Sequence, residues 1–189
     1  MPVKMNSSGG GSVTLDVPST GTDYTQTLVG VSTTLAPIVL GTAQNTTSGT
    51  SVEYLNIPSW VKRITVMFNS VSTNGTNSVI VQLGSTSYKT TGYLGGVGWV
   101  GASSTGFAIT DGFCFCVVDA TQIHSGTMTI SYMGNNMWAF ASCAGRSSGP
   151  YVIVGGGSVT LSGVLDRLRV TTSGQTDAFD LGSVNIMYE

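Results

Sequence analysis

Apolar and polar residues alternate along two stretches in the middle of the chain, between positions 52 and 84. The apolar residues that share a face are Ile64, Val66 and Phe68 in the first stretch and Val79, Val81 and Leu83 in the second. A period of two is typical of β-strands, whose successive side chains point to opposite faces. Asn74 and Gly75 lie between the stretches, and this pair tolerates the positive φ of a tight turn. We therefore predict a β-hairpin here.

Further short stretches have the composition or alternation of strands. They are residues 113–118, 127–132, 137–143, 151–154, 165–170 and 183–188. Residues 135–136 are expected to form a turn between two of these strands, and residues 173–176 to join the last two. The glycine-rich segment 85–110 is expected to be irregular. No long stretch has a helical period. The pattern predicts an all-β fold, a jelly-roll-like antiparallel β-sandwich.

The heptapeptide GGGSVTL occurs twice, at residues 9–15 and 155–161. Chance recurrence is one explanation in a chain with 26 glycines. The other is a structural one, in which each copy is a flexible turn that leads into an edge strand. A phosphate-binding loop would need Lys followed by Ser or Thr at the start of a helix, and neither copy has this.

The chain divides into a leader, a linker and one domain. The leader, residues 1–42, has a short strand at Val13, Thr14 and Leu15 but too few apolar residues for a core of its own. We expect it to become ordered against a neighbouring protein. Residues 43–51 are rich in hydroxyl side chains and are expected to be a linker. The β-sandwich domain then covers residues 52–189.

Charge is scarce. Charged residues make up 8% of the chain, against about 25% in ordinary soluble domains. Disorder is excluded because 41% of the residues are hydrophobic and the net charge is only −2. The few Lys and Arg residues form no basic stripe, which argues against nucleic acid as a partner. Glycine and polar residues interrupt every long uncharged run, which argues against membrane insertion. No signal segment is recognisable, so we expect synthesis in a cytoplasm.

The three cysteines, Cys114, Cys116 and Cys143, are expected to be buried free thiols. Their odd number disfavours a disulfide framework. A zinc site that combines them with His124, the single histidine, is the alternative, but the spacing is not that of known zinc sites. We therefore expect no metal and no cofactor.

Catalytic chemistry finds little support. No nucleophile motif accompanies His124, which a serine triad would need. Asp111 and Asp119 flank the strand at 113–118, but eight residues of strand span more than about 20 Å. This separation is too large for a pair of catalytic carboxylates. We interpret these aspartates, and Asp177 and Asp180, as turn residues. The chain is expected not to be an enzyme.

Aromatic residues in the glycine-rich segment are the candidate ligand-binding residues. They are Tyr88, Tyr93 and Trp99, together with Lys89. Flat rings suit stacking on the apolar faces of sugars, while a Lys and nearby hydroxyls can bind polar edges. The alternative is that Trp99 at least belongs to the core.

Three stretches resemble segments of small tail-fibre and virion-surface proteins of tailed bacteriophages. They are GGGSVTLDVPSTGTDYTQTLVG at 9–30, IPSWVKRITVMFNSVSTNG at 57–75 and LDRLRVTTSGQTDAFDLGSVNIMYE at 165–189. The first resembles the leader of phage fibre proteins and the last their closing hairpin. The resemblance implies a virion structural protein, made in the host bacterial cytoplasm, that attaches through its leader, at Val13, Thr14 and Leu15, to other virion proteins.

Within this resemblance a short tail fibre or receptor-binding tip that contacts a host surface glycan is the expected role. A capsid decoration or head-fibre protein is one alternative, and a carbohydrate-binding module of a bacterial surface protein is another. The resemblance also implies a homotrimer. The scarcity of charge agrees, because Lys rarely blocks the strand edges that a monomer would expose.

Overall fold

The computed structural model describes residues 3–6, 9–10, 12–15, 37–101, 105–116, 120–149 and 151–189. The chain forms two compact units, Met1–Leu35 and Ala36–Glu189. In the first unit, β1 (Val3–Asn6) pairs antiparallel with β2 (Ser12–Leu15). This confirms the strand predicted at Val13–Leu15.

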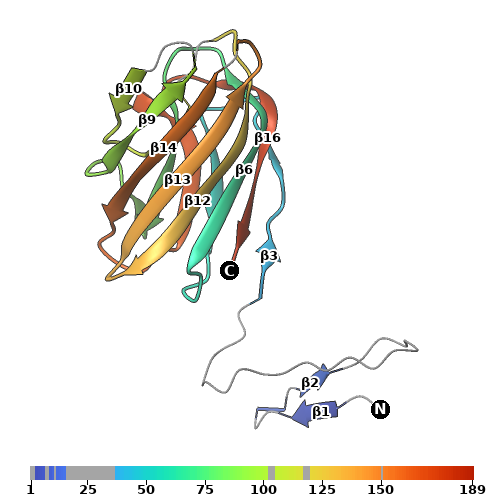
Figure 1. Cartoon of the computed structure of the whole chain (residues 1–189). Helices are drawn as coiled ribbons and strands as arrows, with labels where there is room; N and C mark the ends of the chain where they lie inside the picture. The colour runs from blue at the N-terminus through green and yellow to red at the C-terminus, as the bar shows by residue number, and fades with distance from the viewer. Residues whose placement is uncertain are drawn as a thin grey trace. The chain divides into compact units, whose positions relative to one another are not determined.

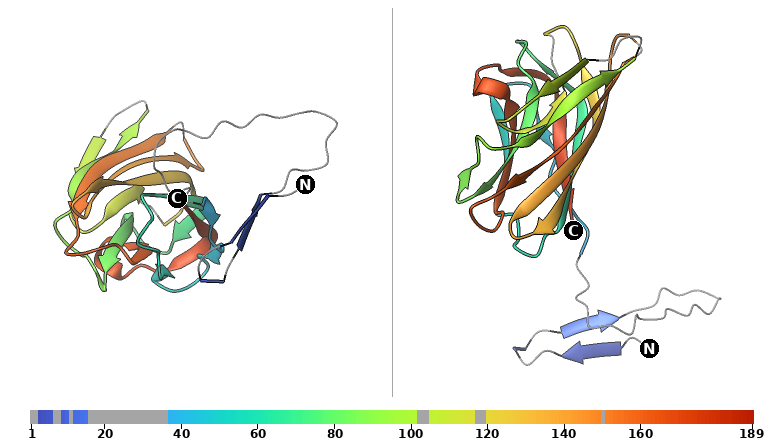
Figure 2. Two further views of the ribbon diagram at one scale, coloured as in Figure 1. Left: turned by 90° about the horizontal axis from the view of Figure 1, so that it is seen from below. Right: turned by 60° about the vertical axis from the view of Figure 1, so that its left-hand side comes forward.

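The second unit is a β-sandwich of two antiparallel sheets, as predicted (Figures 1 and 2). The larger sheet has the order β10-β9-β14-β13-β12-β6-β16-β3, with β4 also paired to β16, and the smaller sheet has the order β11-β7-β15-β5, with β8 beside β7. The larger sheet contains β3 (Val39–Leu40), β4 (Gln44–Asn45), β6 (Arg63–Thr73), β9 (Leu94–Val100), β10 (Thr105–Ala108), β12 (His124–Gly134), β13 (Met137–Arg146), β14 (Val152–Thr160) and β16 (Phe179–Tyr188). The smaller sheet contains β5 (Ser51–Leu55), β7 (Val79–Ser85), β8 (Ser87–Tyr88), β11 (Phe113–Cys116) and β15 (Arg167–Thr172).

Helix is almost absent from the described residues. They contain one three-residue 3₁₀ turn, η1 (Ser173–Gln175), and no helix in them has the length and apolar character needed to cross a bilayer.

Strand pairs are nested along the chain. β6 pairs with β16 in the larger sheet, β7 with β15 in the smaller one, and β9 with β14 in the larger one again. This nesting resembles the winding of a jelly roll, although β12 and β13 are inserted between the pairs. The hairpin predicted for residues 64–83 is therefore wrong. Both strands exist, but they belong to different sheets, and the same is true of β15 and β16.

The core lies between the inner faces of the two sheets, where aromatic rings from β11 meet rings from the larger sheet. Phe115 stacks on Phe68 with 3.6 Å between ring centroids, and Phe113 stacks on Phe140 at 4.4 Å. Stacked or edge-on pairs add about 0.5–1.5 kcal/mol beyond the burial of their area. These contacts join the sheets across the sandwich.

Residues 39–51 belong to the sandwich and are not a linker. β3 and β4 both pair with β16. The fully buried Thr46 donates its backbone N–H to the carbonyl of Gly182 at 2.9 Å and its hydroxyl to that of Leu181 at 2.8 Å. The predicted boundary at residue 52 is therefore too late, and the compact unit begins at Ala36.

The glycine-rich segments form strands, and glycine is needed at the positions where neighbouring backbones approach closely. A Cβ atom on Gly157 would overlap the carbonyl oxygen of Leu94, and one on Gly155 would lie 2.7 Å from the hydroxyl of Ser142. Segment 85–110, expected to be irregular, contains β9 and β10. The second GGGSVTL copy lies inside β14, between β13 and β9, so its interpretation as a turn before an edge strand is wrong.

We predict that replacing Gly157 with Ala destabilises the sandwich, whereas the same change at the adjacent Gly156 does not. The nearest atom to a Cβ on Gly156 is 3.7 Å away, an ordinary contact, whereas Gly157 has no room. Overpacking typically costs about 1–3 kcal/mol. Chemical denaturation followed by tryptophan fluorescence measures both free energies of unfolding. Equal stability of the two variants would contradict the close approach of β9 and β14.

Candidate binding surfaces

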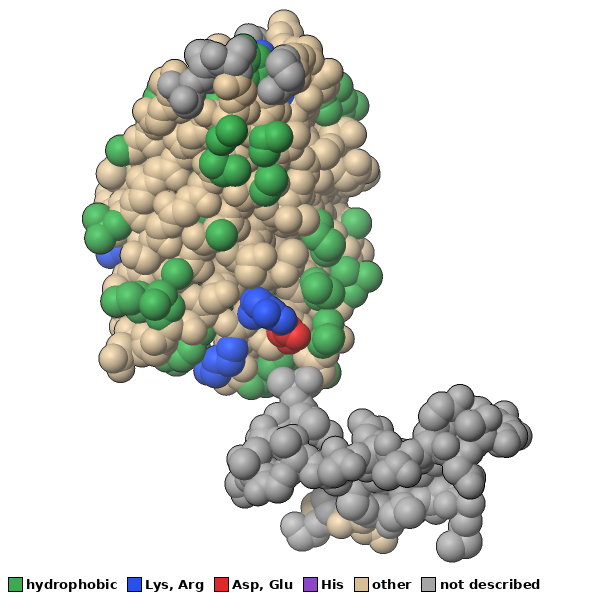
Figure 3. Space-filling view, viewed as in Figure 1, with side chains coloured by type: hydrophobic (Ala, Val, Ile, Leu, Met, Phe, Trp, Pro, Cys, Tyr) green, Lys and Arg blue, Asp and Glu red, His purple; other side chains and the backbone are tan. Residues whose placement is uncertain are grey.

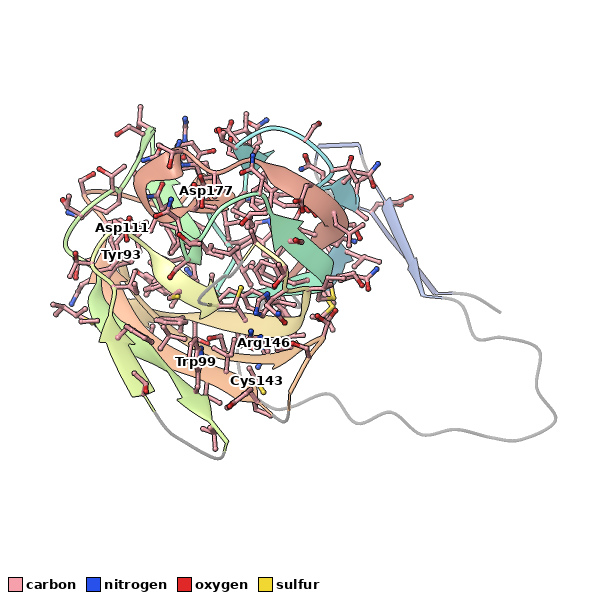
Figure 4. The ribbon with its side chains drawn as sticks, turned by 90° about the horizontal axis from the view of Figure 1, so that it is seen from above. Tyr93, Trp99, Asp111, Cys143, Arg146 and Asp177 are labelled. Atoms are coloured by element: carbon pink, nitrogen blue, oxygen red, sulfur yellow. The ribbon has the colours of Figure 1, made fainter. Side chains whose placement is uncertain are left out.

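The four residues predicted to bind a ligand do not form one surface. Tyr93 is 1% exposed and its ring packs edge-on against Phe113, 5.0 Å away. Its hydroxyl accepts a hydrogen bond from the Leu83 N–H at 2.8 Å and donates one to the Lys89 carbonyl at 3.1 Å. Figure 4 shows Tyr93 beside Asp111, on a different flank from Trp99. The ring of Tyr93 offers no face to a ligand, so we leave it out of the candidate surfaces.

Tyr88 lies on the smaller sheet beneath two arginines. The guanidinium carbon of Arg169 lies 4.4 Å from the centre of its ring, and that of Arg167 lies 5.9 Å away. Burial and the nearby Glu53 carboxylate raise the pKa of Tyr88 to about 12, against the opposing effect of the two arginines. The hydroxyl is therefore neutral near pH 7. Lys89 follows directly and is half-buried.

The position of Arg169 also has a structural reason. Its Nε donates to Oε1 of Gln82 at 2.7 Å, and its Nη2 donates to Oε1 of Gln175 at 2.8 Å. Gln82 is completely buried, and its own amide donates to the Asp111 carbonyl at 2.6 Å. A buried amide needs hydrogen-bond partners. Arg169, whose guanidinium lies over the Tyr88 ring, thus stabilises the smaller sheet through its hydrogen bonds to Gln82 and Gln175.

Trp99 belongs to a second group at one end of the larger sheet. Its ring centroid lies 5.9 Å from that of Phe107 on β10 and 6.3 Å from that of Tyr151. The guanidinium carbon of Arg146, at the end of β13, lies 6.0 Å from the ring of Tyr151. Phe107 is 40% exposed. We call Trp99, Phe107, Tyr151 and Arg146 the aromatic cluster, and Figure 4 shows Trp99 and Arg146 near each other.

The aromatic cluster lies at the end of the sandwich opposite to the one where the chain enters. β9 and β13 end beside it, and β10 and β14 begin there. At the other end, β3 enters in register with the last residues of β16 (Figure 1). Partly exposed rings beside a guanidinium can stack on a sugar or a flat polar group.

Sequence reasoning found Trp99 but missed Phe107, Tyr151 and Arg146. The residues that contact Trp99 can be recognised only once the positions of β9 and β10 are known. A signal was present, because Trp99 and Val97 alternate with Gly96 and Gly98 as residues of a strand do. Treating this segment as a loop hid it.

His124 is completely buried next to the aromatic cluster and has no hydrogen-bond partner on either ring nitrogen. Its neighbour in the register of β13 is Arg146, whose Nε is also buried without a partner. Burial, and then the charge of Arg146, lower the pKa of His124 to about 4. The imidazole is therefore neutral at pH 7, which the fold requires because a second buried cation would have no partner.

The cysteines do not form a metal site in the described part of the chain, where no group of three or more potential metal ligands occurs. Cys114 and Cys116 are buried free thiols, as predicted, and burial raises the pKa of Cys114 to about 12 and that of Cys116 well above its ordinary value. The prediction is wrong for Cys143, which is exposed on β13.

Two of the aspartates hold turns. The Asp177 carboxylate accepts hydrogen bonds from the backbone N–H of Asn77 at 2.8 Å and from its side-chain amide at 2.7 Å. These bonds fix the loop that carries the chain from β6 to β7. Asp111 accepts a hydrogen bond from the Ser173 hydroxyl at 2.8 Å. Asp119 lies outside the described residues.

The predicted attachment residues Val13, Thr14 and Leu15 lie in β2, in register with Met5, Lys4 and Val3 of β1. Their attachment role stays a prediction. Comparisons of the chain with family models, with curated proteins and with solved structures found no match.

We predict that the sandwich loses stability as the pH falls from 6.5 towards 4, and that His124 causes part of this loss. In that range the unfolded chain binds a proton at His124 and the folded chain does not, because the folded pKa is about 4 against an ordinary 6.5. The neutral His124 contributes on the order of 3 kcal/mol to the free energy of unfolding relative to pH 4. This stabilisation is fully present above pH 6.5 and is lost as the pH falls towards 4.

Denaturant unfolding of the chain and of a His124→Gln variant, measured from pH 7.5 to pH 4, isolates this contribution. The variant should show a smaller fall in the free energy of unfolding between pH 6.5 and 4. An identical slope in the two proteins would show that His124 does not titrate in this way.

Proposed function

We propose that this chain is a non-enzymatic structural protein of a bacteriophage virion, a short tail fibre or receptor-binding tip. The observation that carries the proposal is the division of the chain into a short N-terminal unit and a separate β-sandwich. Together with the resemblance of residues 9–30, 57–75 and 165–189 to phage fibre proteins, it fits a protein that attaches by one part and presents the other.

The N-terminal unit suits attachment because its described strands pair only with each other. An isolated two-stranded ribbon is marginally stable in water. In the described residues each strand has a partner on one edge only, so we propose that a strand of another virion protein is added to the other edge. Val13, Thr14 and Leu15 on β2 are the residues we propose for this contact.

The aromatic cluster suits contact with the host. It lies at the end of the sandwich away from the point where the chain enters, and it combines rings with one guanidinium. We propose a host surface glycan as its ligand, with Trp99 and Phe107 as the stacking residues. The fibre is a homotrimer in this proposal.

A capsid decoration or head-fibre protein is the second candidate, since the same two units could serve on a capsid. Its place on the particle distinguishes it from a tail fibre. A carbohydrate-binding module of a bacterial surface protein is the third candidate. It would bind sugar without any association of residues 1–35 with a virion.

Removal of residues 1–35 should leave the sandwich folded but prevent its incorporation into phage particles. The truncated chain keeps every strand pair of the second unit, because none of the described pairs joins the two units. Thermal unfolding checks the fold, and immunoblotting of purified particles checks incorporation. Incorporation at the normal level would refute attachment through this segment.

Replacing Phe107 and Trp99 together with Ala should reduce adsorption of particles to host cells by about tenfold or more, as expected for central aromatic contacts. Tyr88→Ala is the matched control, because Tyr88 is an aromatic residue of the other sheet. Both variant proteins should still be incorporated into particles. Normal adsorption of the double variant, or an equal loss in the control, would place the receptor site elsewhere.

A further inference from the structure

Four neighbouring strands of the larger sheet, β9, β14, β13 and β12, carry almost no charge. In β9, β12, β13 and β14 the single Asp, Glu, Lys or Arg residue is Arg146. Its neighbour in the register is the buried His124, so the side chain of Arg146 lies on the inner side of the sheet and not on its outer face. Figure 3 shows this face with scattered hydrophobic groups in its middle and charged side chains mainly at its lower end.

Large apolar side chains stand out from the same face. Leu94 is 72% exposed and Val100 56%, and the exposed Val152, Val154 and Met137 lie on the neighbouring strands β14 and β13. The register places these residues on the side opposite to the core residues Trp138, Phe140 and Ile153. Val100 lies opposite Val152 and close to Val154, whereas Leu94 and Met137 lie towards the other end of these strands. Exposed apolar side chains collected on one face are typical of an interaction site.

A shallow hollow of about 550 Å³ crosses β10, β9 and β14 among these side chains. Gly98, Gly106 and Gly156 line it beside Val154. The backbone does not require glycine at these three positions, since a Cβ atom would have its nearest neighbour at 3.4, 3.9 and 3.7 Å respectively. Glycine inside a strand weakens it. The missing side chains therefore keep the hollow open at a cost to the isolated fold.

The size and chemistry of this face fit a second copy of the same chain. Four strands about 4.8 Å apart and seven to eleven residues long cover roughly 600 Å². Two such faces together bury about 1,200 Å², which is the lower end of the range for stable protein interfaces. A face without charge excludes a strongly charged partner. Because it carries both protruding aliphatic side chains and a hollow, it can complement another copy of itself.

We propose that the outer face of β9, β14, β13 and β12 is buried against further copies of this chain. The number of copies, three, rests on the proposed function, whereas the choice of face rests on charge, exposure and area alone. Ala141, exposed near the centre of β13, lies in the contact, and so does Cys143 two residues further along.

Cys143 reports on this contact without any substitution, because the other two cysteines are buried in the core. The full chain should elute in size-exclusion chromatography with light scattering at a multiple of 19.5 kDa. In that state Cys143 should react with a maleimide at least tenfold more slowly than in a monomeric variant. A monomeric full chain at micromolar concentration would overturn the proposal.

Two variants test the face itself, and one serves as control. Ala141→Lys places a charge at its centre and Gly156→Val fills the hollow, and both should yield folded monomers with reactive Cys143. Thr47→Lys, exposed and remote from these strands, should keep the wild-type mass. If both face variants keep that mass, the contact lies elsewhere and the proposal fails. Incorporation into particles is measured separately, so the proposed function can survive this failure.

Discussion

The packing of one short strand holds the sandwich together. β11 has four residues, all of them buried, and it sends Phe113 and Phe115 across to Phe140 and Phe68 on the larger sheet. β11 also lies against β14, where the carbonyl oxygen of Cys114 would be 3.1 Å from a Cβ atom on Gly155.

Because both sheets turn their apolar faces towards the shared core, their outer faces are free to differ. The smaller sheet carries Arg167, paired to Asp166 at 2.7 Å, and Arg169, which is held by two glutamines. In the larger sheet, β6 carries Arg63 and β16 carries Asp180. The larger sheet is nearly uncharged over four strands. The asymmetry therefore lies within the larger sheet, where β9, β14, β13 and β12 contain a single charged residue, Arg146. It supports the view that one face is for assembly and that the end with the aromatic cluster is for binding.

The sequence predicted strands well but not their partners. The alternation at Ile64–Phe68 correctly indicates which side chains face the core, because a period of two is a local property. In β7 the residues on both faces are buried, so the alternation at Val79–Leu83 does not separate them. Pairing depends on contacts over a hundred residues apart, such as the one between β6 and β16, and the Asn74-Gly75 turn is compatible with a crossing between sheets as well as with a hairpin. Similarly, Tyr93 and Trp99 have the same local setting of glycines. Tyr93 is fully buried against Phe113 of β11, whereas Trp99 packs against the core and is only partly buried. No local pattern reveals this difference.

The central claim is that the chain is a virion component whose larger sheet faces its own copies. A density map of the intact phage particle tests this most directly. The account predicts the sandwich in three copies around one axis, with the outer faces of β9, β14, β13 and β12 turned inward and residues 1–35 lying against another virion protein. A map in which the sandwich is absent from the particle, or in which this face is bare to solvent, would contradict it.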